Sequence, residues 1–228
     1  AVERRAKDIV LKVEQGELVI HRGMSGSLRV VKEARAAEKH DHFDMVLDNG
    51  ATLRLTDPRR FGAVLWQSEQ EPLSILQKMG PEPLTEAFNI DAFLASANNR
   101  KVAIKQFIMD NKVVVGVGNI YATEALFAAG INPQAPVNEL SRAKLSKLIS
   151  AIKYILGVAI ERGGTTLKDF VDAQGQPGYF AQELQVYGRK GQTCNNCQKA
   201  LREIKQGQRS TVFCPSCQRM PRMKKTST

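Results

Sequence analysis

The spacing of apolar residues changes part-way along this 228-residue chain. Up to about residue 67, short runs in which apolar and polar residues alternate are separated by turn-forming residues, a pattern typical of antiparallel β-strands. From about Thr85 onward, apolar residues recur every three or four positions, as they do on one face of a helix. The pattern therefore predicts a sheet followed by helices.

Six strands are expected in the first third of the chain. They lie at residues 9–13, 18–22, 27–31, 43–47, 51–55 and 62–66. Asp48-Asn49-Gly50 separates the fourth strand from the fifth. Asn-Gly is the preferred pair for a type I′ hairpin turn, in which both central residues have positive φ, so we expect that turn here.

Three helices are expected in the middle of the chain, at residues 102–108, at residues 119–129 and from Ser141 onward. The third has the clearest pattern, and Gly163-Gly164 closes it. Its apolar stripe consists of Leu145, Leu148, Ile149, Ile152, Ile155, Leu156, Ala159 and Ile160. A loop at residues 172–179, which contains glycine, proline and glutamine, leads from the helices toward the last part of the chain.

All the cysteines of the chain lie in that last part. Cys194 and Cys197 form one C-x2-C pair, and Cys214 and Cys217 form a second pair sixteen residues later. Two such pairs supply four thiolates to a tetrahedral zinc ion. Because four sulfurs leave the metal no open position, we expect one structural Zn²⁺ and no catalytic metal.

The charge of the chain is concentrated around these cysteines. The formal net charge is +10, and residues 186–228 contain ten Lys or Arg residues against one acid, Glu203. A field of this kind favours a polyanion such as nucleic acid, although anionic membranes and acidic proteins also bind basic chains. Arg209, between the two cysteine pairs, is either a solvated charge at the tip of a hairpin or a donor to phosphate.

The chain has no apolar run of eighteen residues, and its first residues lack the apolar region of a signal peptide. The cysteines are all assigned to one metal site, as is usual in a reducing compartment. We therefore expect a cytoplasmic protein that does not cross a membrane. We also expect it to be a monomer.

Two turns in the predicted sheet carry side chains suited to nucleic acid. Residues 57–62 place Arg59 beside Phe61, and such a pair can wedge into a base stack and hold what it displaces, although a solvated turn has the same composition. Met24, in the tight turn at residues 23–26, is either a second wedge or an ordinary core residue. His40 is expected to contact phosphate, and a metal pair with His42 is the alternative.

Gly116 and Gly118 precede the helix expected at Asn119. The segment lacks the third glycine and the strand-helix-strand unit of a dinucleotide site, so that function is not expected. The free N–H groups at the start of a helix can instead receive a phosphate. Asn119 is there either as a phosphate contact or as a helix cap.

Six blocks of sequence, in order over nearly the whole chain, resemble the bacterial formamidopyrimidine-DNA glycosylases. The blocks are residues 4–7, 23–28, 56–62, 109–111 with 115–122, 163–170 and 178–191. Members of that family remove oxidised purines such as 8-oxoguanine and formamidopyrimidines from damaged double-stranded DNA, and then cleave the abasic strand by β,δ-elimination. The resemblance implies an α+β multidomain fold, with an antiparallel β-sandwich, a helix-two-turns-helix domain and a zinc-finger β-hairpin.

The resemblance also implies roles for individual residues. Lys7 and Arg209 match catalytic residues, and Met24, Arg59 and Phe61 match the trio that fills the gap left by an extruded base. His40, Arg59, Arg100 and Asn119 match contacts to the DNA backbone, with arginine at position 100 where the family has lysine. Thr165, Thr166 and Lys168 match the loop at the damaged base.

One departure concerns the catalytic amine. The family's nucleophile is an N-terminal proline, which attacks the sugar C1′ and is followed by a glutamate acid. Positions 1–3 here are Ala, Val and Glu, and they match the run before the Arg-Arg-Ala-Lys block, so Glu3 is not that acid. We expect the chain as written to lack the start of the sandwich and to bind DNA with little or no base excision.

The expected domains are the rest of the sandwich at residues 1–82, the helix-two-turns-helix domain with its lesion loop at 83–180, the zinc finger at 185–219 and a basic tail at 220–228. Two alternatives stay open. One is an endonuclease VIII-like glycosylase for oxidised pyrimidines, against which the Met24, Arg59 and Phe61 trio argues. The other is a non-catalytic zinc-ribbon DNA-binding protein.

Overall fold

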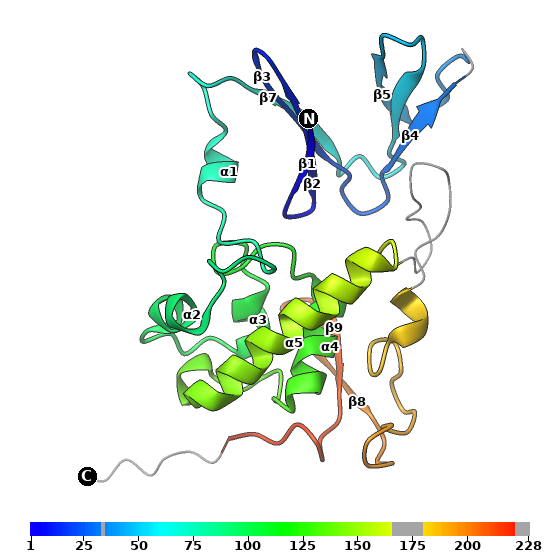
Figure 1. Ribbon diagram of the computed structural model, residues 1–228. Helices are drawn as coiled ribbons and strands as arrows, with labels where there is room; N and C mark the ends of the chain where they lie inside the picture. Colours follow the sequence, from blue (N-terminus) through cyan, green and yellow to red (C-terminus); the bar gives the residue numbers. More distant parts are fainter. Residues whose placement is uncertain (33–34, 166–179, 222–228) are drawn as a thin grey trace. The chain divides into compact units, whose positions relative to one another are not determined.

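The computed structural model describes residues 1–32, 35–165 and 180–221. The chain divides into two compact units, one formed by Ala1–Gln77 with Ala159–Gln182 and the other by Lys78–Val158 with Glu183–Thr228. The order of elements is sheet, then helices, then a β-hairpin with a cysteine pair on either side of it, which we call the cysteine hairpin. This order confirms the expected fold class (Figure 1). The domain boundaries proposed from the sequence stay predictions.

Two antiparallel sheets form the first unit. The four-stranded sheet has the order β1-β2-β3-β7, and the three-stranded sheet has the order β4-β6-β5. The strands are β1 (Val2–Arg5), β2 (Asp8–Val13), β3 (Gly16–His21), β4 (Ser27–Val31), β5 (Asp41–Val46), β6 (Thr52–Thr56) and β7 (Ala63–Gln67). All six expected strands are present, and β1 is an addition that four mostly polar residues did not predict.

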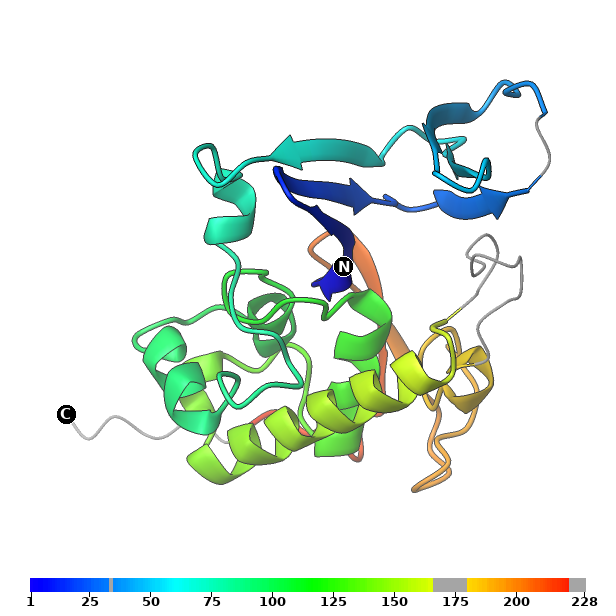
Figure 2. The same cartoon turned by 45° about the horizontal axis from the view of Figure 1, so that its top comes forward.

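The chain crosses between these sheets twice. Residues 22–26 connect β3 to β4, and residues 57–62 connect β6 to β7. Figure 2 shows β3 and β7 side by side, leading toward β4 and β6. Each crossover therefore joins the same two sheets: β3 and β7 are paired in the four-stranded sheet, and β4 and β6 are paired in the three-stranded sheet.

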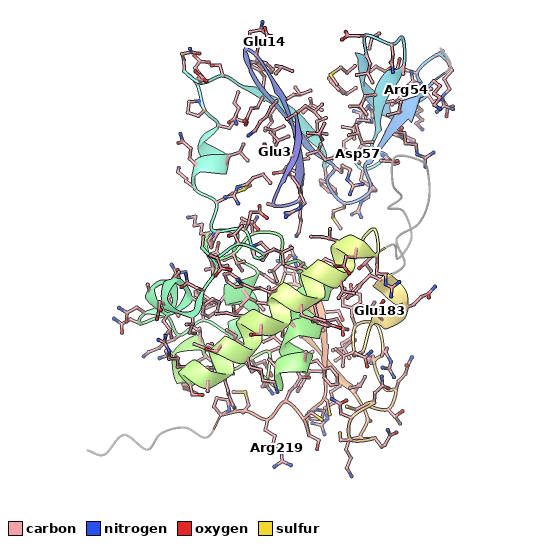
Figure 3. All side chains as sticks on the ribbon, in the orientation of Figure 1. Glu3, Glu14, Arg54, Asp57, Glu183 and Arg219 are labelled. Carbon is pink, nitrogen blue, oxygen red and sulfur yellow. The ribbon has the colours of Figure 1, made fainter. Side chains whose placement is uncertain are left out.

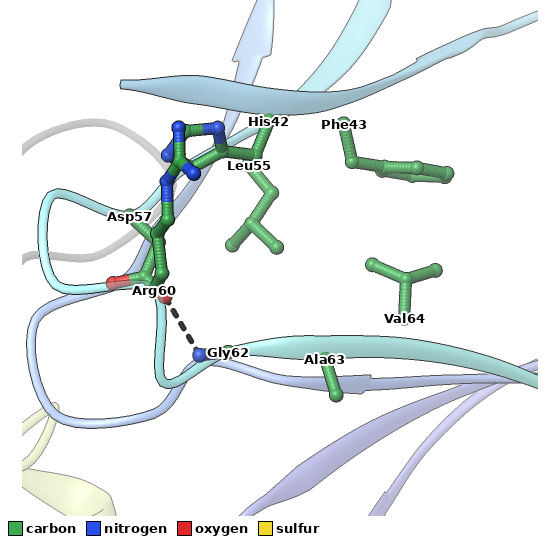
Figure 4. A pocket seen from close by; sticks show the side chains of 8 residues that line it. All are labelled: His42, Phe43, Leu55, Asp57, Arg60, Gly62, Ala63 and Val64. Carbon is green, nitrogen blue, oxygen red and sulfur yellow. Dashed lines mark hydrogen bonds between the residues drawn. The ribbon is translucent and has the colours of Figure 1, made fainter.

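The apolar centre of the first unit lies between the two sheets. Ile20, Leu28 and Leu55 are buried there, and Phe43 and Val64 pack against them while only partly buried. A pocket of about 410 Å³ opens beside this cluster. Phe43 and Val64 point into it from opposite strands, and Asp57 and Arg60 lie at one end (Figure 4).

The turn between β5 and β6 differs from the predicted type I′ turn. Leu47 N–H donates to the Ala51 carbonyl at 2.8 Å and Gly50 N–H donates to the Leu47 carbonyl at 2.9 Å, so three residues form the loop. Gly50 has a φ of +79°, but Asn49 is not among the positive-φ residues. Asn49 Oδ1 instead accepts the Ala51 N–H at 3.0 Å, and this local bond favours the longer loop with one left-handed glycine.

Helices make up most of the second unit. They are α2 (Ile90–Ala97), α3 (Ile104–Ile108), α4 (Asn119–Ala129), the 3-10 turn η1 (Val137–Glu139) and α5 (Arg142–Glu161), which continues past Val158 into the first unit. The hairpin β8 (Arg202–Gln206) and β9 (Arg209–Phe213) follows them in the chain, while α1 (Ser74–Gln77) and most of η2 (Phe180–Glu183) belong to the first unit. No helix in residues 1–32, 35–165 and 180–221 is long and apolar enough to cross a membrane.

Helix α5 carries the predicted apolar stripe with one exception. Seven of the eight expected residues are buried, but Ile160 is 52% exposed. It lies one turn beyond Leu156, where the helix is about to end. Gly164 N–H donates to the Ala159 carbonyl and Gly163 N–H to the Ile160 carbonyl, so the expected pair of glycines closes the helix.

Helix α4 is mostly buried and holds the segment that leads to the cysteines. The Glu124 carboxylate accepts backbone N–H bonds from Gln185 at 2.9 Å, Val186 at 3.0 Å and Tyr187 at 2.7 Å. Glu124 is 4% exposed, and Val186 is fully buried beside Phe127 of the same helix. The Glu124 carboxylate therefore joins α4 to the segment that precedes the first cysteine pair.

We predict that Glu124→Gln lowers the free energy of unfolding by about 3 kcal/mol, because an amide can accept these bonds with only one oxygen and without charge. Urea unfolding measures the change. Glu139→Gln, at an exposed position of η1, is the matched control and is expected to leave the stability unchanged. Equal stabilities for the two variants would contradict this role of Glu124.

Candidate functional site

The four cysteines come together as the sequence predicts. Their sulfur atoms all lie within 4.8 Å of one another, with Cys194 Sγ 3.9 Å from Cys217 Sγ and Cys197 Sγ 3.4 Å from Cys214 Sγ. All four are free of disulfides. A tetrahedron with Zn–S bonds of about 2.3 Å places its sulfurs about 3.8 Å apart, so the cluster fits a structural zinc ion.

The second cysteine pair is attached to the helical part through Gln218, a side chain that is 1% exposed. Gln218 Oε1 accepts the Cys214 N–H at 2.8 Å, and its Nε2 donates to the Ile131 carbonyl at 2.8 Å. Asn132 Nδ2 donates to the Gln218 carbonyl at 2.9 Å. The metal cluster is thus held against the chain that follows α4.

A buried lysine lies where the hairpin meets helices α3 and α4. Lys105 is 1% exposed, and its ammonium donates to Asn119 Oδ1 and to Thr211 Oγ1, both at 2.6 Å. A third, longer bond of 3.4 Å goes to the Ser210 carbonyl. In the part of the chain that the structure describes, these partners are neutral oxygens and none is a carboxylate.

This environment lowers the pKa of Lys105 to about 8. Burial is the main cause, because it disfavours the charged amine, and the nearby Arg209 guanidinium adds repulsion. Sequence reasoning missed Lys105. The available signal was its place on a short helix between the apolar residues Ile104 and Phe107, both of which are buried.

Asn119 takes part in this cluster rather than capping its helix. Gly118 is the N-cap residue of α4, and it makes no side-chain capping bond. The Asn119 amide accepts from Lys105 and donates through Nδ2 to the Ser210 carbonyl at 3.1 Å. The side chain therefore bridges α3, α4 and the cysteine hairpin.

Arg209 lies next to this cluster but not at the hairpin tip. Gly207 and Gln208 form the tip, with φ values of +55° and +61°, and Arg209 is the first residue of β9. The pair with positive φ is what a two-residue hairpin turn requires. Arg209 is exposed, and the carbonyl of the next residue, Ser210, bonds both Lys105 and Asn119.

In the first unit the two crossovers present apolar side chains to solvent. Met24 is 57% exposed and Phe61 is 56% exposed, so Met24 is not a core residue. The guanidinium carbon of Arg59 lies 5.2 Å from the centre of the Phe61 ring, the geometry of a cation–π contact. The structure therefore brings Arg59 and Phe61 together on one turn, as the motif predicts.

His40 is half-buried at the end of a loop held by Arg54. The Arg54 guanidinium forms a bidentate pair with Asp44, with bonds of 2.8 and 2.7 Å, and also donates to the carbonyls of Arg35 and Ala36. Figure 3 labels Arg54 on the three-stranded sheet and Asp57 at the end of the same strand. The His40 and His42 rings are 6.5 Å apart at their centres. Among the described residues, neither histidine belongs to a group of three or more His, Cys, Asp or Glu side chains that could hold a metal ion.

Lys7 lies in the two-residue turn between β1 and β2, and its side chain is exposed. Its neighbour Ala6 has a φ of +56°, a strained conformation for a residue with a Cβ atom. Beside the turn, Asp8 Oδ1 is 2.6 Å from His21 Nδ1. This hydrogen bond raises the pKa of His21, while partial burial and the charge of Lys7 act in the opposite direction.

The remaining predicted residues are spread over both units. Arg100 is exposed, lies 3.9 Å from Asp110 and has its guanidinium over the Phe107 ring at 5.6 Å. Thr165 is half-buried after the end of α5. Thr166 and Lys168 lie outside the described residues.

Three family models match the chain. The formamidopyrimidine-DNA glycosylase N-terminal domain matches residues 1–64, and the H2TH domain of the same glycosylases matches residues 79–171. A zinc finger found in FPG and IleRS matches residues 191–219.

The chain is also similar to curated and solved proteins. It is 57% identical over 219 residues to a formamidopyrimidine-DNA glycosylase of Stutzerimonas stutzeri, which covers 96% of this chain and 81% of that protein. The crystal structure of MutM (Fpg) from Thermus thermophilus superposes with a TM-score of 0.87 at 36% identity, covering 96% of this chain and 82% of that one. A complex between Lactococcus lactis Fpg and DNA containing an abasic site has a TM-score of 0.88 at 33% identity, with coverages of 96% and 81%.

We predict that the purified chain contains one zinc ion, and that a strong chelator removes it and unfolds the cysteine hairpin, because four close sulfurs lose their common ligand. Metal analysis and circular dichroism measure this. Cys214→Ser together with Cys217→Ser is expected to give the same result without chelator. Ser216→Ala, between those cysteines, is the control that keeps the metal. A metal-free chain with an intact hairpin would refute the assignment.

We predict that Lys105 makes the stability of the chain increase with pH above about 8. Its folded pKa lies near 8 and its ordinary value is 10.5, so between these values the unfolded chain binds the extra proton. Below pH 8 both states hold the proton and Lys105 contributes no slope. Urea unfolding from about pH 7 to about pH 10 tests this. Lys105→Met should flatten the rise and the exposed control Lys112→Met should keep it; equal slopes in the two variants would contradict the assignment.

Proposed function

This chain belongs to the formamidopyrimidine-DNA glycosylase family, and from that membership we propose that it binds double-stranded DNA containing an oxidised purine for base-excision repair. The substrates are 8-oxoguanine and formamidopyrimidines, and the full reaction removes the base and cleaves the abasic strand. The single observation that carries the proposal is that the similarity to this family extends over 96% of the chain. The protein acts as a monomer in the bacterial cytoplasm, associated with the nucleoid through its DNA.

In the second unit, the proposed DNA contacts are Asn119, Arg209 and Arg100. Asn119 lies at the start of α4, where free N–H groups attract phosphate, and Arg209 is exposed beside it in the chain's most basic region. The zinc ion supplies a rigid hairpin on which Arg209 keeps its place. Lys105 contributes by holding Asn119 and β9 together beneath these contacts.

In the first unit, Met24, Arg59 and Phe61 form the proposed wedge. An enzyme that acts on a base within a duplex must move the nucleotide out of the stack, which costs a few kcal/mol. Exposed apolar side chains can fill the gap, and a guanidinium can pair with what the missing base leaves behind. His40 adds a phosphate contact on a loop that Arg54 holds in place.

Lys7 and Arg209 are the proposed participants in chemistry. Each is a cation on an exposed turn or strand end, suited to stabilise negative charge on a sugar or phosphate oxygen. Arg209 has the elimination step assigned to it, and the loop with Thr165, Thr166 and Lys168 surrounds the damaged base. The steps assigned to these residues are binding, extrusion and charge stabilisation.

Binding to labelled duplexes tests the proposal. We predict at least about tenfold tighter binding to 8-oxoguanine opposite cytosine than to the undamaged duplex, since a damaged pair costs less to open. Arg209→Ala should weaken binding to both duplexes and reduce the salt dependence by about one phosphate contact, because the residue contacts backbone and not base. Fluorescence anisotropy at several salt concentrations measures both effects.

Arg202→Ala is the matched control for this experiment. Arg202 lies on the same hairpin, opposite Phe213, whereas Arg209 lies opposite Gln206 at the other end. Arg202→Ala removes the same charge as Arg209→Ala, but it should change the salt dependence of binding less. Tight, salt-dependent binding without preference for the lesion would favour the non-catalytic zinc-ribbon alternative and overturn the proposal.

A further inference from the structure

Both crossovers between the sheets of the first unit converge on one side chain. Met24 lies in the crossover from β3 to β4, and Arg59 and Phe61 lie in the crossover from β6 to β7. The proposed wedge is therefore built from two segments more than thirty residues apart. Side chains on separate turns can act together only if the two turns are held at a fixed distance and orientation.

Asp57 begins the second crossover and is 2% exposed. Its Oδ2 accepts the Gly62 N–H at 2.6 Å, which closes the turn that contains Arg59 and Phe61 (Figure 4). Its Oδ1 accepts the Ser25 hydroxyl at 3.3 Å, and Ser25 follows Met24 in the first crossover. One carboxylate thus bonds both turns of the wedge.

The backbone of Asp57 adds a third segment. Its N–H donates to the His40 carbonyl at 2.8 Å, and its carbonyl accepts the Arg60 N–H at 3.2 Å. His40 is the proposed phosphate contact of this unit. Each proposed DNA contact of this unit is therefore close to a bond of Asp57. Met24 precedes Ser25, the His40 carbonyl accepts the Asp57 N–H, and Arg59 and Phe61 lie in the turn that Asp57 closes.

The backbones of the two crossovers lie in close contact. A Cβ atom on Gly23 would lie 2.6 Å from the Phe61 carbonyl carbon, so the two backbones touch. Arg60 has a φ of +55°, which costs on the order of 1 kcal/mol or more for a residue with a side chain. A strained turn packed against another backbone needs strong bonds to keep its shape, and the Asp57 carboxylate supplies them.

The charge state of Asp57 agrees with this geometry. Burial by itself would raise the pKa of the carboxyl, but the N–H groups of Gly62, Arg59 and Arg60 and the Ser25 hydroxyl keep it below its ordinary range. Asp57 is therefore ionised at neutral pH. An ionised acceptor forms stronger hydrogen bonds than a neutral one.

We propose that Asp57 is the positioning residue of the wedge, whose buried carboxylate holds the Met24 turn and the Arg59–Phe61 turn in the arrangement that enters the base stack. The inference rests on the proposed function, because it assigns a role in opening damaged DNA. Asp57 does not touch the DNA itself. It acts through Ser25, Gly62 and the two turns.

A fluorescent base tests the role. The whole chain is mixed with a duplex that has a stable tetrahydrofuran abasic analogue opposite 2-aminopurine, whose fluorescence increases when a wedge separates it from the bases stacked on it. Wild-type protein should give a large increase. Asp57→Ala should lose most of this increase. It should also lower the ratio of the affinities for this duplex and for the matched undamaged one by at least about tenfold, the change that losing one charge-assisted hydrogen bond produces. Asp57→Asn should lie between, because its amide oxygen can still accept the Gly62 N–H.

Controls separate positioning from folding. Asp48→Ala, an exposed residue of the three-residue loop after β5, should behave as wild type. Phe61→Ala should lose the fluorescence increase, and adding Asp57→Ala to it should cause no further loss, because the two changes affect the same wedge. Thermal unfolding and zinc content are measured for every variant. If Asp57→Ala does not fold, Asp57→Asn and Ser25→Ala decide the matter.

The outcomes are distinct. A folded Asp57→Ala protein that keeps the wild-type fluorescence increase, while Phe61→Ala loses it, would overturn the positioning role and leave the proposed function standing. If Asp57→Ala does not fold, wild-type fluorescence in both Asp57→Asn and Ser25→Ala has the same meaning. A wild-type protein that produces no increase and no preference for the abasic duplex would overturn the proposed function, and this inference with it.

Discussion

The arrangement of the second unit depends on the hydrogen bonds of one buried ammonium. Lys105 has no carboxylate partner among the described residues, and a buried charge costs several kcal/mol unless polar groups replace water around it. Asn119, Thr211 and the Ser210 carbonyl are those groups, and they come from the start of a helix and from the cysteine hairpin. The hairpin cannot move away from the helices without exposing donors and acceptors that would then lack partners. The same bonds fix the position of Arg209, because it directly precedes Ser210 and Thr211, the hairpin residues to which Lys105 donates.

The first unit uses the opposite charge for the same purpose. Asp57 is a buried anion whose hydrogen bonds come from neutral donors, and the exposed residues around it are the ones proposed to contact DNA. In the described part of both units, a buried charge held by neutral groups lies close in sequence or in space to exposed residues proposed to contact DNA, Arg209 in the second unit and Arg59 and Phe61 in the first. Hydrogen bonds to neutral groups have fixed directions, so they position the exposed groups more narrowly than an apolar contact of the same size would. The zinc ion adds a third constraint, since it holds the cysteine hairpin as one rigid piece.

Much of the fold could be predicted because local patterns decide it. Alternation of apolar residues located six of the seven strands in the first unit, and the three-four spacing located α4 and α5 with their terminal glycines. The errors also have local physical causes. The Asn49 side chain bonds the backbone of Ala51 and lengthens the predicted two-residue turn, and Ile160 leaves the apolar stripe because the helix ends there. The two-residue tip at Gly207 and Gln208 moved Arg209 from the turn into the strand.

The sequence by itself determined the zinc ligands, the basic character and the family, because cysteine spacing, charge and ordered blocks of residues are properties of the chain and need no coordinates. Only the tertiary structure decided which polar residues act as supports. Lys105 looked like one more lysine and Asp57 like the start of a surface turn, since nothing in a linear pattern shows that a charge is buried or which distant donors surround it. Asn119 could be a cap or a contact until folding brought Ser210 and Lys105 to its amide. Burial and long-range hydrogen bonding join residues that are far apart in the chain, and for that reason they appear only when the chain is folded.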